Sequence, residues 1–161
     1  SFWKNRNIAP ILEELPSEEH EWFHTLGYTI GGMMLFPSKR VDGKNTINGA
    51  RGMDHRIKDR FDLTVECIRR YYLDIDSPLR EVFMRYADFF ALFGSFRGYV
   101  EFFLLQDLVT EDYSAVKFQA PFRSFDESPI PSSKEAYVSY RKLAIDFLEA
   151  RNRRIELANC S

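Results

Sequence analysis

The chain has 161 residues, 45% of them hydrophobic and 29% charged, which fits one globular domain with a substantial buried core. Its net charge of −2 provides no overall field that would draw it to nucleic acid or to an anionic membrane. Its longest apolar runs are about five residues, far below the roughly 20 that a membrane helix needs, and no signal peptide is recognisable, so we expect a cytoplasmic protein.

Two short helices are predicted at the start of the chain. Residues 8–14 form the first candidate, which ends before Pro16 because proline cannot continue a helix. Residues 17–27 form the second. Ser17 suits the N-cap, acidic residues follow in the first turn, and Gly27 suits the position after the last turn.

A small β-hairpin is predicted next. Residues 28–36 mix Ile, Met and Phe with a pair of glycines, and the dipeptide Asp42-Gly43 is a strong signal for a hairpin turn. Residues 45–48 are then the returning strand. A further short strand over residues 116–120 is available to pair with this hairpin.

Three longer helices are predicted in the middle of the chain. Residues 55–72 carry apolar side chains at steps of three and four, with charged residues between them, and this pattern is typical of an amphipathic helix. Residues 78–93 form the second helix, capped by Ser77 and stopped by Gly94. Residues 96–108, which Ser95 can cap, are apolar on almost every side, so we expect this third helix to be buried nearly all round.

The last predicted element is a long helix from residue 132 towards residue 157, where Ser132 and Glu135 have the spacing of a capping box. With 15 Phe, 8 Tyr and 2 Trp, the chain is rich in aromatic residues, and we expect its core to be built around Phe and Tyr. These patterns predict a mainly α fold, a compact bundle of four to five helices with a small antiparallel β-hairpin. We expect one domain over residues 1–161, N-terminally incomplete because the sequence begins without Met.

A resemblance to a known family is carried by four segments: GYTIGGMMLFPSKRVDGKNTINGARG, DRFDLTVECIRRYY, RYADFFALFGSF and RGYVEFFLLQDLV. Together with SPIP and the helix ending ARNRRIE, over roughly residues 26–157, they are similar to a family of uncharacterised bacterial proteins classed as a domain of unknown function. The resemblance implies a bacterial cytosolic protein with further residues upstream. It implies no activity, ligand or catalytic residue.

One motif points to a metalloenzyme. His20, Glu21 and His24 form H-E-x-x-H, a spacing that on a helix lets two imidazoles bind Zn²⁺ while the Glu activates a bound water. A third ligand would be His55 or an acid such as Glu66, and no spacing favours either. The interpretation we favour is two surface histidines that match the motif by chance.

A second signal is the charge pattern of residues 39–60, which contain seven Lys or Arg and three Asp, whereas residues 101–135 contain seven acids and three bases. In a functional interpretation, two glycines let the backbone approach an anion at a helix N-terminus, and Arg51, Arg56 and Arg60 clamp a phosphate or carboxylate. In the interpretation we favour, the basic and acidic regions face each other within one fold.

Charged residues on two of the predicted helices suggest an ion-pair network. Arg97 and Glu101 form one i to i+4 pair, Glu66 and Arg70 form another on the earlier helix, and Asp62 lies on that helix as well. Such pairs contribute about 0.2 to 0.5 kcal/mol each when exposed, whereas buried ones need a structural or functional reason to persist. We favour solvated or structural pairs over a functional cluster.

The two cysteines, Cys67 and Cys160, are far apart in the sequence and indicate reduced thiols rather than a disulfide. Cys67 falls within a predicted helix and is expected to be a small core residue. Neither is assigned a role.

The preferred hypothesis is a non-enzymatic module that binds an anionic ligand or an acidic protein partner. The alternatives are a zinc hydrolase that uses residues 20–24 and a helical nuclease that uses Arg51, His55 and Arg60, although R-x-x-x-H is one residue short of the usual nuclease spacing. No cofactor and no membrane are expected, and nucleic acid and self-association are left open. The candidate anion-binding or partner-binding residues are Asn48, Arg51, His55, Arg56, Arg60 and Arg97.

Overall fold

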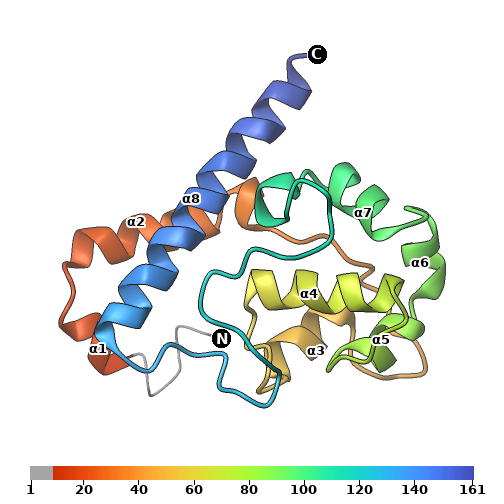
Figure 1. Ribbon diagram of the computed structural model, residues 1–161, viewed down its shortest axis with the longest axis horizontal. Coiled ribbons are helices and arrows are strands. Elements are labelled where there is room, and N and C mark those ends of the chain that lie inside the picture. The colour runs from red at the N-terminus through yellow and green to blue at the C-terminus, as the bar shows by residue number, and fades with distance from the viewer. Residues whose placement is uncertain (1–8) are drawn as a thin grey trace. The chain divides into compact units, whose positions relative to one another are not determined.

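The computed structural model describes residues 9–161, which form eight α-helices and two short 3-10 helices (Figure 1). The mainly α class is therefore confirmed, with more and shorter helices than the four to five predicted. The predicted β-hairpin is wrong, because these residues contain no sheet and only one isolated antiparallel bridge, between Val109 and Val116. None of the helices within residues 9–161 combines the length and the hydrophobicity needed to cross a membrane.

By their internal contacts the described residues divide into two compact units. The first unit consists of residues 35–118 and 122–129, and the second unit consists of residues 9–34, 119–121 and 130–161. The expectation of a single domain stays a prediction.

The second unit contains α1 (Ala9–Glu13), α2 (Ser17–Gly27), the 3-10 helix η2 (Ile30–Gly32) and the long helix α8 (Lys134–Asn159). The N-cap of α8 is Ser133, one residue after the predicted cap, and its side chain accepts a hydrogen bond from the Ala136 amide at 3.1 Å. The long C-terminal helix is confirmed. It buries an apolar stripe at steps of three and four, made of Tyr137, Tyr140, Ala144, Phe147 and Leu148.

The segment that was expected to be the first hairpin strand is instead bound to α8. The Gly31 amide donates to Asn152 Oδ1 at 2.7 Å, and Arg151 Nη1 donates to the carbonyl oxygens of Gly31 at 2.9 Å and Met33 at 2.7 Å. These side chains satisfy backbone groups that a partner strand would otherwise pair. A Cβ at residue 31 would lie 2.5 Å from Asn152 Oδ1, so only glycine fits there.

The predicted turn at Asp42-Gly43 does form. Both residues have positive φ, 53° and 67°, as a type I′ turn requires, and the Lys44 amide donates to the Val41 carbonyl at 3.0 Å. The flanking residues do not pair as strands because Thr46 instead caps a helix, α3 (Ile47–Met53), by accepting from the Gly49 amide at 3.2 Å.

The other helices of the first unit are α4 (Phe61–Tyr72), α5 (Arg80–Met84), α6 (Ala87–Ala91), α7 (Phe96–Phe102) and the 3-10 helix η3 (Gln106–Leu108). Each of the three helices predicted over residues 55–108 is shorter than expected. Residues 55–59 are turns, in which Lys58 and Asp59 have left-handed φ of 50° and 62°, and residues 78–93 form two helices instead of one. The predicted stop at Gly94, with φ of 74°, and the cap at Ser95, which accepts from the Gly98 amide, are confirmed.

The core of the first unit is aromatic, as expected. Phe90 lies 4.9 Å from both Tyr71 and Phe83 between ring centroids, and Tyr99 lies 4.7 Å from Phe103. One prediction about burial is wrong, since Phe102 of α7 is 68% exposed. The helix that is buried on nearly all sides is α4, where every residue from 62 to 68 is buried.

Candidate functional site

Arg51, the centre of the predicted anion site, is engaged with its own turn. Its Nε donates to Thr64 Oγ1 at 3.0 Å, its Nη2 donates to the Asp59 carbonyl at 3.1 Å, and its Nη1 lies 3.6 Å from the Asp59 carboxylate. The side chain is only 13% exposed. A Cβ at Gly52 would lie 3.1 Å from Asp59 Oδ1, so this glycine makes room for a carboxylate of the same chain.

Arg56 forms a two-point ion pair with Asp54. Its Nε donates to Oδ1 at 3.0 Å and its Nη2 to Oδ2 at 2.8 Å, and the Arg56 backbone amide also donates to Oδ1. Burial alone would raise the pKa of the Asp54 carboxyl, but the hydrogen bonds from Arg56 outweigh it and hold that pKa below its ordinary value. Asp54 therefore stays charged and keeps Arg56 paired.

Arg60 is sealed inside the first unit. Its Nε donates to Asp62 Oδ1 at 3.1 Å, its Nη2 to Asp62 Oδ2 at 2.6 Å, and its Nη1 to the Pro129 carbonyl at 2.8 Å. The two side chains are 2% and 0% exposed. A helical nuclease would need Arg60 to face a phosphodiester together with Arg51 and His55, and a guanidinium buried in this way does not.

The remaining predicted site residues lie in different settings. Asn48 is exposed on α3, and His55 is exposed in the turn that follows it. Arg97 is on α7, where its Nε donates to Glu101 at 2.8 Å and its guanidinium lies 4.9 Å from the centre of the Tyr113 ring. The predicted Arg97–Glu101 pair thus forms, with Tyr113 as an additional partner that the sequence did not indicate.

Pairing of these arginines changes where the positive charge of residues 39–60 is exposed. Arg51, Arg56 and Arg60 are paired with aspartates of the same segment or of α4, so the exposed positive charge rests on Lys39, Arg40 and Lys44, with Lys58 half-buried. Within residues 9–161, Lys44 is the residue of this group that forms an ion pair. Its Nζ lies 3.9 Å from the carboxylate of Glu81, which is itself exposed.

Residues 39–45, called the basic loop below, are fixed at both ends. Tyr86 Oη donates to the Lys39 carbonyl at 2.9 Å, and Arg85 Nη2 donates to the Asn45 carbonyl at 3.0 Å. The Asp42-Gly43 turn lies between these two points. The backbone of the basic loop is therefore held in one conformation while its cationic side chains remain in solvent.

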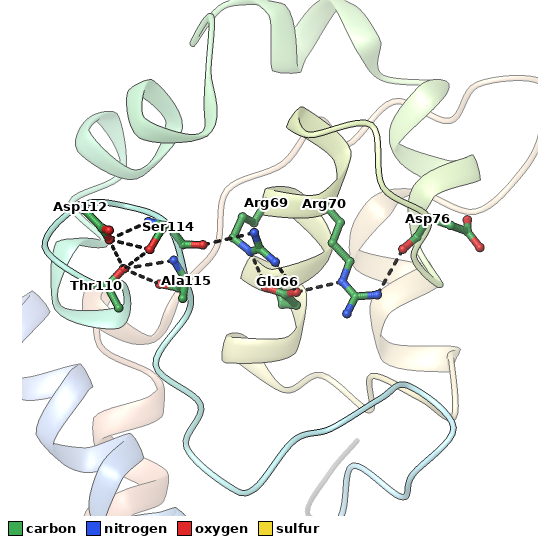
Figure 2. Close-up of polar contacts among 8 residues, drawn as sticks. All are labelled: Glu66, Arg69, Arg70, Asp76, Thr110, Asp112, Ser114 and Ala115. Atoms are coloured by element: carbon green, nitrogen blue, oxygen red, sulfur yellow. Dashed lines mark hydrogen bonds and ion pairs between the residues drawn. The ribbon is translucent and has the colours of Figure 1, made fainter.

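A second charged cluster centres on Glu66 of α4, whose side chain is 4% exposed (Figure 2). Glu66 accepts from Arg69 Nε at 2.8 Å and Nη2 at 3.0 Å, and from Arg70 Nε at 2.8 Å. Arg69 Nη1 also donates to the Ser114 carbonyl, and Arg70 Nη1 donates to the Asp76 carbonyl. The cluster therefore joins α4 to two loops.

This arrangement corrects the predicted network in part. The Glu66–Arg70 pair was expected, but Asp62 is paired with Arg60, and Arg69 was not predicted to take part. Its position three residues after Glu66 is the signal that could have identified it, since i to i+3 neighbours meet on a helix surface.

The H-E-x-x-H histidines lie one turn apart on α2, with ring centroids 6.3 Å from each other. Partial burial, with contributions from His24 and Arg141, lowers the pKa of His20 and favours its neutral form. Among residues 9–161, no group of three or more His, Cys, Asp or Glu side chains is placed to hold a metal ion. The motif thus supplies two ligands where a zinc site needs at least three from the protein.

Both cysteines are free thiols. Cys67 is fully buried in α4, and burial raises its pKa to about 12, so the thiol stays protonated and unreactive at neutral pH. Cys160 is exposed near the end of the chain.

The fold and these contacts define a mainly α-helical protein in which Arg51, Arg56, Arg60 and Arg97 are committed to ion pairs and a basic loop is exposed. The chain belongs to a family of unknown function, DUF6994, whose model matches residues 1–155, in agreement with the resemblance found in the sequence. Comparisons with curated proteins and with solved structures give no significant match.

Proposed function

We propose that the protein is a binding module whose basic loop binds an acidic segment of a protein partner. The observation that supports this proposal best is the exposure of Lys39, Arg40 and Lys44 on a backbone that Arg85 and Tyr86 hold at its two ends. A loop that is ordered before binding loses little conformational entropy when a partner docks.

An extended acidic partner fits this surface better than a small anion. A phosphate or carboxylate clamp needs several N–H donors converging on one point. The guanidinium groups of Arg51 and Arg60, which were expected to supply them, already donate to Asp59, Asp62 and backbone carbonyls. Lysine ammonium groups act as separate point charges, so a row of carboxylates is the complementary partner.

The expected interaction is electrostatic and depends on salt. Exposed charges are screened over about 8 Å at physiological ionic strength, so binding should be tight at low salt and weaken steeply as salt is added. Such contacts mainly increase the rate of association and contribute less to the lifetime of the complex.

The test compares two triple charge reversals with the same net charge. The loop variant carries Lys39→Glu, Arg40→Glu and Lys44→Glu, and the control carries Lys117→Glu, Arg123→Glu and Lys134→Glu at exposed positions elsewhere. Binding of a labelled polyglutamate peptide is followed by fluorescence anisotropy at increasing salt. We expect the parent and the control to bind and the loop variant to lose binding. Equal loss in both variants, or no binding by the parent at low salt, would overturn the proposal.

A further inference from the structure

The first unit contains a hollow of about 540 Å³ that lies apart from the basic loop in the sequence. It is bounded by the last turn of α4, by Met84 at the end of α5 and by α6. Its volume falls within the roughly 300 to 1,000 Å³ that is common for small-molecule sites.

One wall of the hollow is aromatic. The half-buried rings of Tyr71 and Tyr72 form this wall, and both contact the fully buried ring of Phe90, with centroids 4.9 Å and 6.0 Å away. Tyr72 Oη donates to the Phe90 carbonyl at 2.6 Å, and Tyr71 also contacts Phe83 in an edge-to-face arrangement. Neighbouring rings and this hydrogen bond therefore fix the wall before any ligand arrives.

The space in front of this wall exists because α6 presents two small side chains. Ala87 and Ala91 are four residues apart, which places them on one face of the helix, and both line the hollow and are exposed. A longer side chain at either position would occupy the volume.

The polar groups of the hollow are few. Arg80 pairs with Asp74, whose side chain is 88% exposed. An ion pair with so exposed a carboxylate is weak, so an incoming anion can replace Asp74 at Arg80 with little loss. The hydroxyl of Tyr71 has no hydrogen-bond partner among residues 9–161, whereas that of Tyr72 is used.

We propose that this hollow binds a planar aromatic acid. The ring of the ligand packs against Tyr71 and Tyr72 beside the two alanines, and its carboxylate takes the place of Asp74 at the Arg80 guanidinium. Aromatic stacking supplies affinity for any flat ring, and the charge-assisted hydrogen bonds to Arg80 distinguish an acid from a neutral ligand.

The test uses the full chain and naphthoate as the probe, with naphthamide as the neutral analogue and cyclohexane carboxylate as the non-aromatic one. Titration followed by NMR chemical shifts should show saturable binding of naphthoate at the methyl groups of Ala87 and Ala91. Both analogues should bind at least about tenfold more weakly, which corresponds to 1.4 kcal/mol.

Two variants separate the contributions of charge and space. Arg80→Gln should lower the affinity for naphthoate to that for naphthamide. Ala91→Leu should abolish the binding of both naphthoate and naphthamide. Arg123→Gln, which removes an exposed arginine paired with Glu127 in the same unit, is the control and should bind like the parent. Circular dichroism of each variant checks folding, and Ala87→Leu replaces Ala91→Leu if that variant unfolds. The absence of saturable naphthoate binding, or binding that neither substitution changes, would overturn the proposal.

Discussion

Arg60 and Asp62 form a two-point ion pair that is almost completely withdrawn from solvent, with Nη2 and Oδ2 2.6 Å apart. The third nitrogen of the guanidinium donates to the Pro129 carbonyl, which joins the start of α4 to a residue 69 positions later. Removing two charges from water is costly, and only close geometry and full hydrogen bonding offset that cost. The pair therefore fixes a chain connection whose loss should be measurable.

The first prediction concerns this pair. Asp62→Ala leaves a buried guanidinium without its carboxylate, and we expect it to lower the free energy of unfolding by about 3 to 5 kcal/mol. Urea denaturation followed by circular dichroism measures the change. Replacing both residues, as Arg60→Met with Asp62→Leu, should lower stability less than Asp62→Ala does. If the free energy of unfolding of Asp62→Ala lay within about 1 kcal/mol of the parent value, the pair would contribute little.

The second prediction tests the contact between η2 and α8. Gly31→Ala places a Cβ 2.5 Å from Asn152 Oδ1 and 2.8 Å from the Leu148 carbonyl, so the segment must shift. It then loses the hydrogen bonds that its carbonyls accept from Arg151 and the one that the Gly31 amide donates to Asn152. We expect a loss of about 1 to 3 kcal/mol in urea denaturation.

Gly27→Ala is the matched control for Gly31→Ala. A Cβ at Gly27 would meet nothing within 4 Å, and the residue ends α2 without a positive φ. Alanine favours helix over glycine, so this variant should be neutral or up to about 1 kcal/mol more stable. Equal losses in the two variants would mean that close packing at residue 31 is not the cause.

The parts of the fold that were predicted correctly depend on local chemistry. Gly94 and Ser95 act within four residues of themselves, through a left-handed φ and a hydrogen bond to the Gly98 amide, and both were predicted. The hairpin prediction failed because the partner of residues 28–36 is distant. Arg151 and Gly31 are separated by 120 positions, and no local pattern indicates that a helix near the C-terminus would satisfy this backbone.

The candidate site was predicted less well, because the sequence shows charges but not their burial. On α4, Asp62 and Glu66 occupy positions that the amphipathic pattern assigned to solvent, yet both are buried by pairing with arginines. The acidic partner of Arg56 is two residues away in sequence, so that pairing could have been expected. No sequence pattern indicates the hollow beside Ala87 and Ala91, because it is open only where these two side chains are small.

The third prediction concerns the pH dependence of Asp112. Hydrogen bonds from Ser114 and Thr110 stabilise its carboxylate and lower its pKa from 3.8 to about 2 (Figure 2). Because the folded pKa lies below the unfolded one, this contribution to stability is present above about pH 4 and is lost as the pH falls towards about 2. Carboxyl chemical shifts recorded against pH should show this group titrating well below the other aspartates. Ser114→Ala together with Thr110→Val should return the titration towards 3.8, and an unchanged midpoint would contradict the assigned cause.

The fourth prediction separates the two thiols by their burial. Cys67 has no exposed surface and a pKa of about 12, whereas Cys160 is exposed, so a disulfide reagent at pH 8 should modify one thiol in the native protein and two in urea. In Cys160→Ser, native protein should show almost no reaction, and the slow modification that remains should follow the rate at which α4 opens. Burial keeps the thiol of Cys67 neutral in the folded state, so folding opposes its ionisation. The free energy of unfolding, compared with that of Cys67→Ala, should therefore not rise with pH. A rise would mean that the folded protein stabilises the thiolate. Rapid modification of Cys67 in native Cys160→Ser would mean that α4 is open to solvent, contrary to its burial on all sides from residue 62 to residue 68.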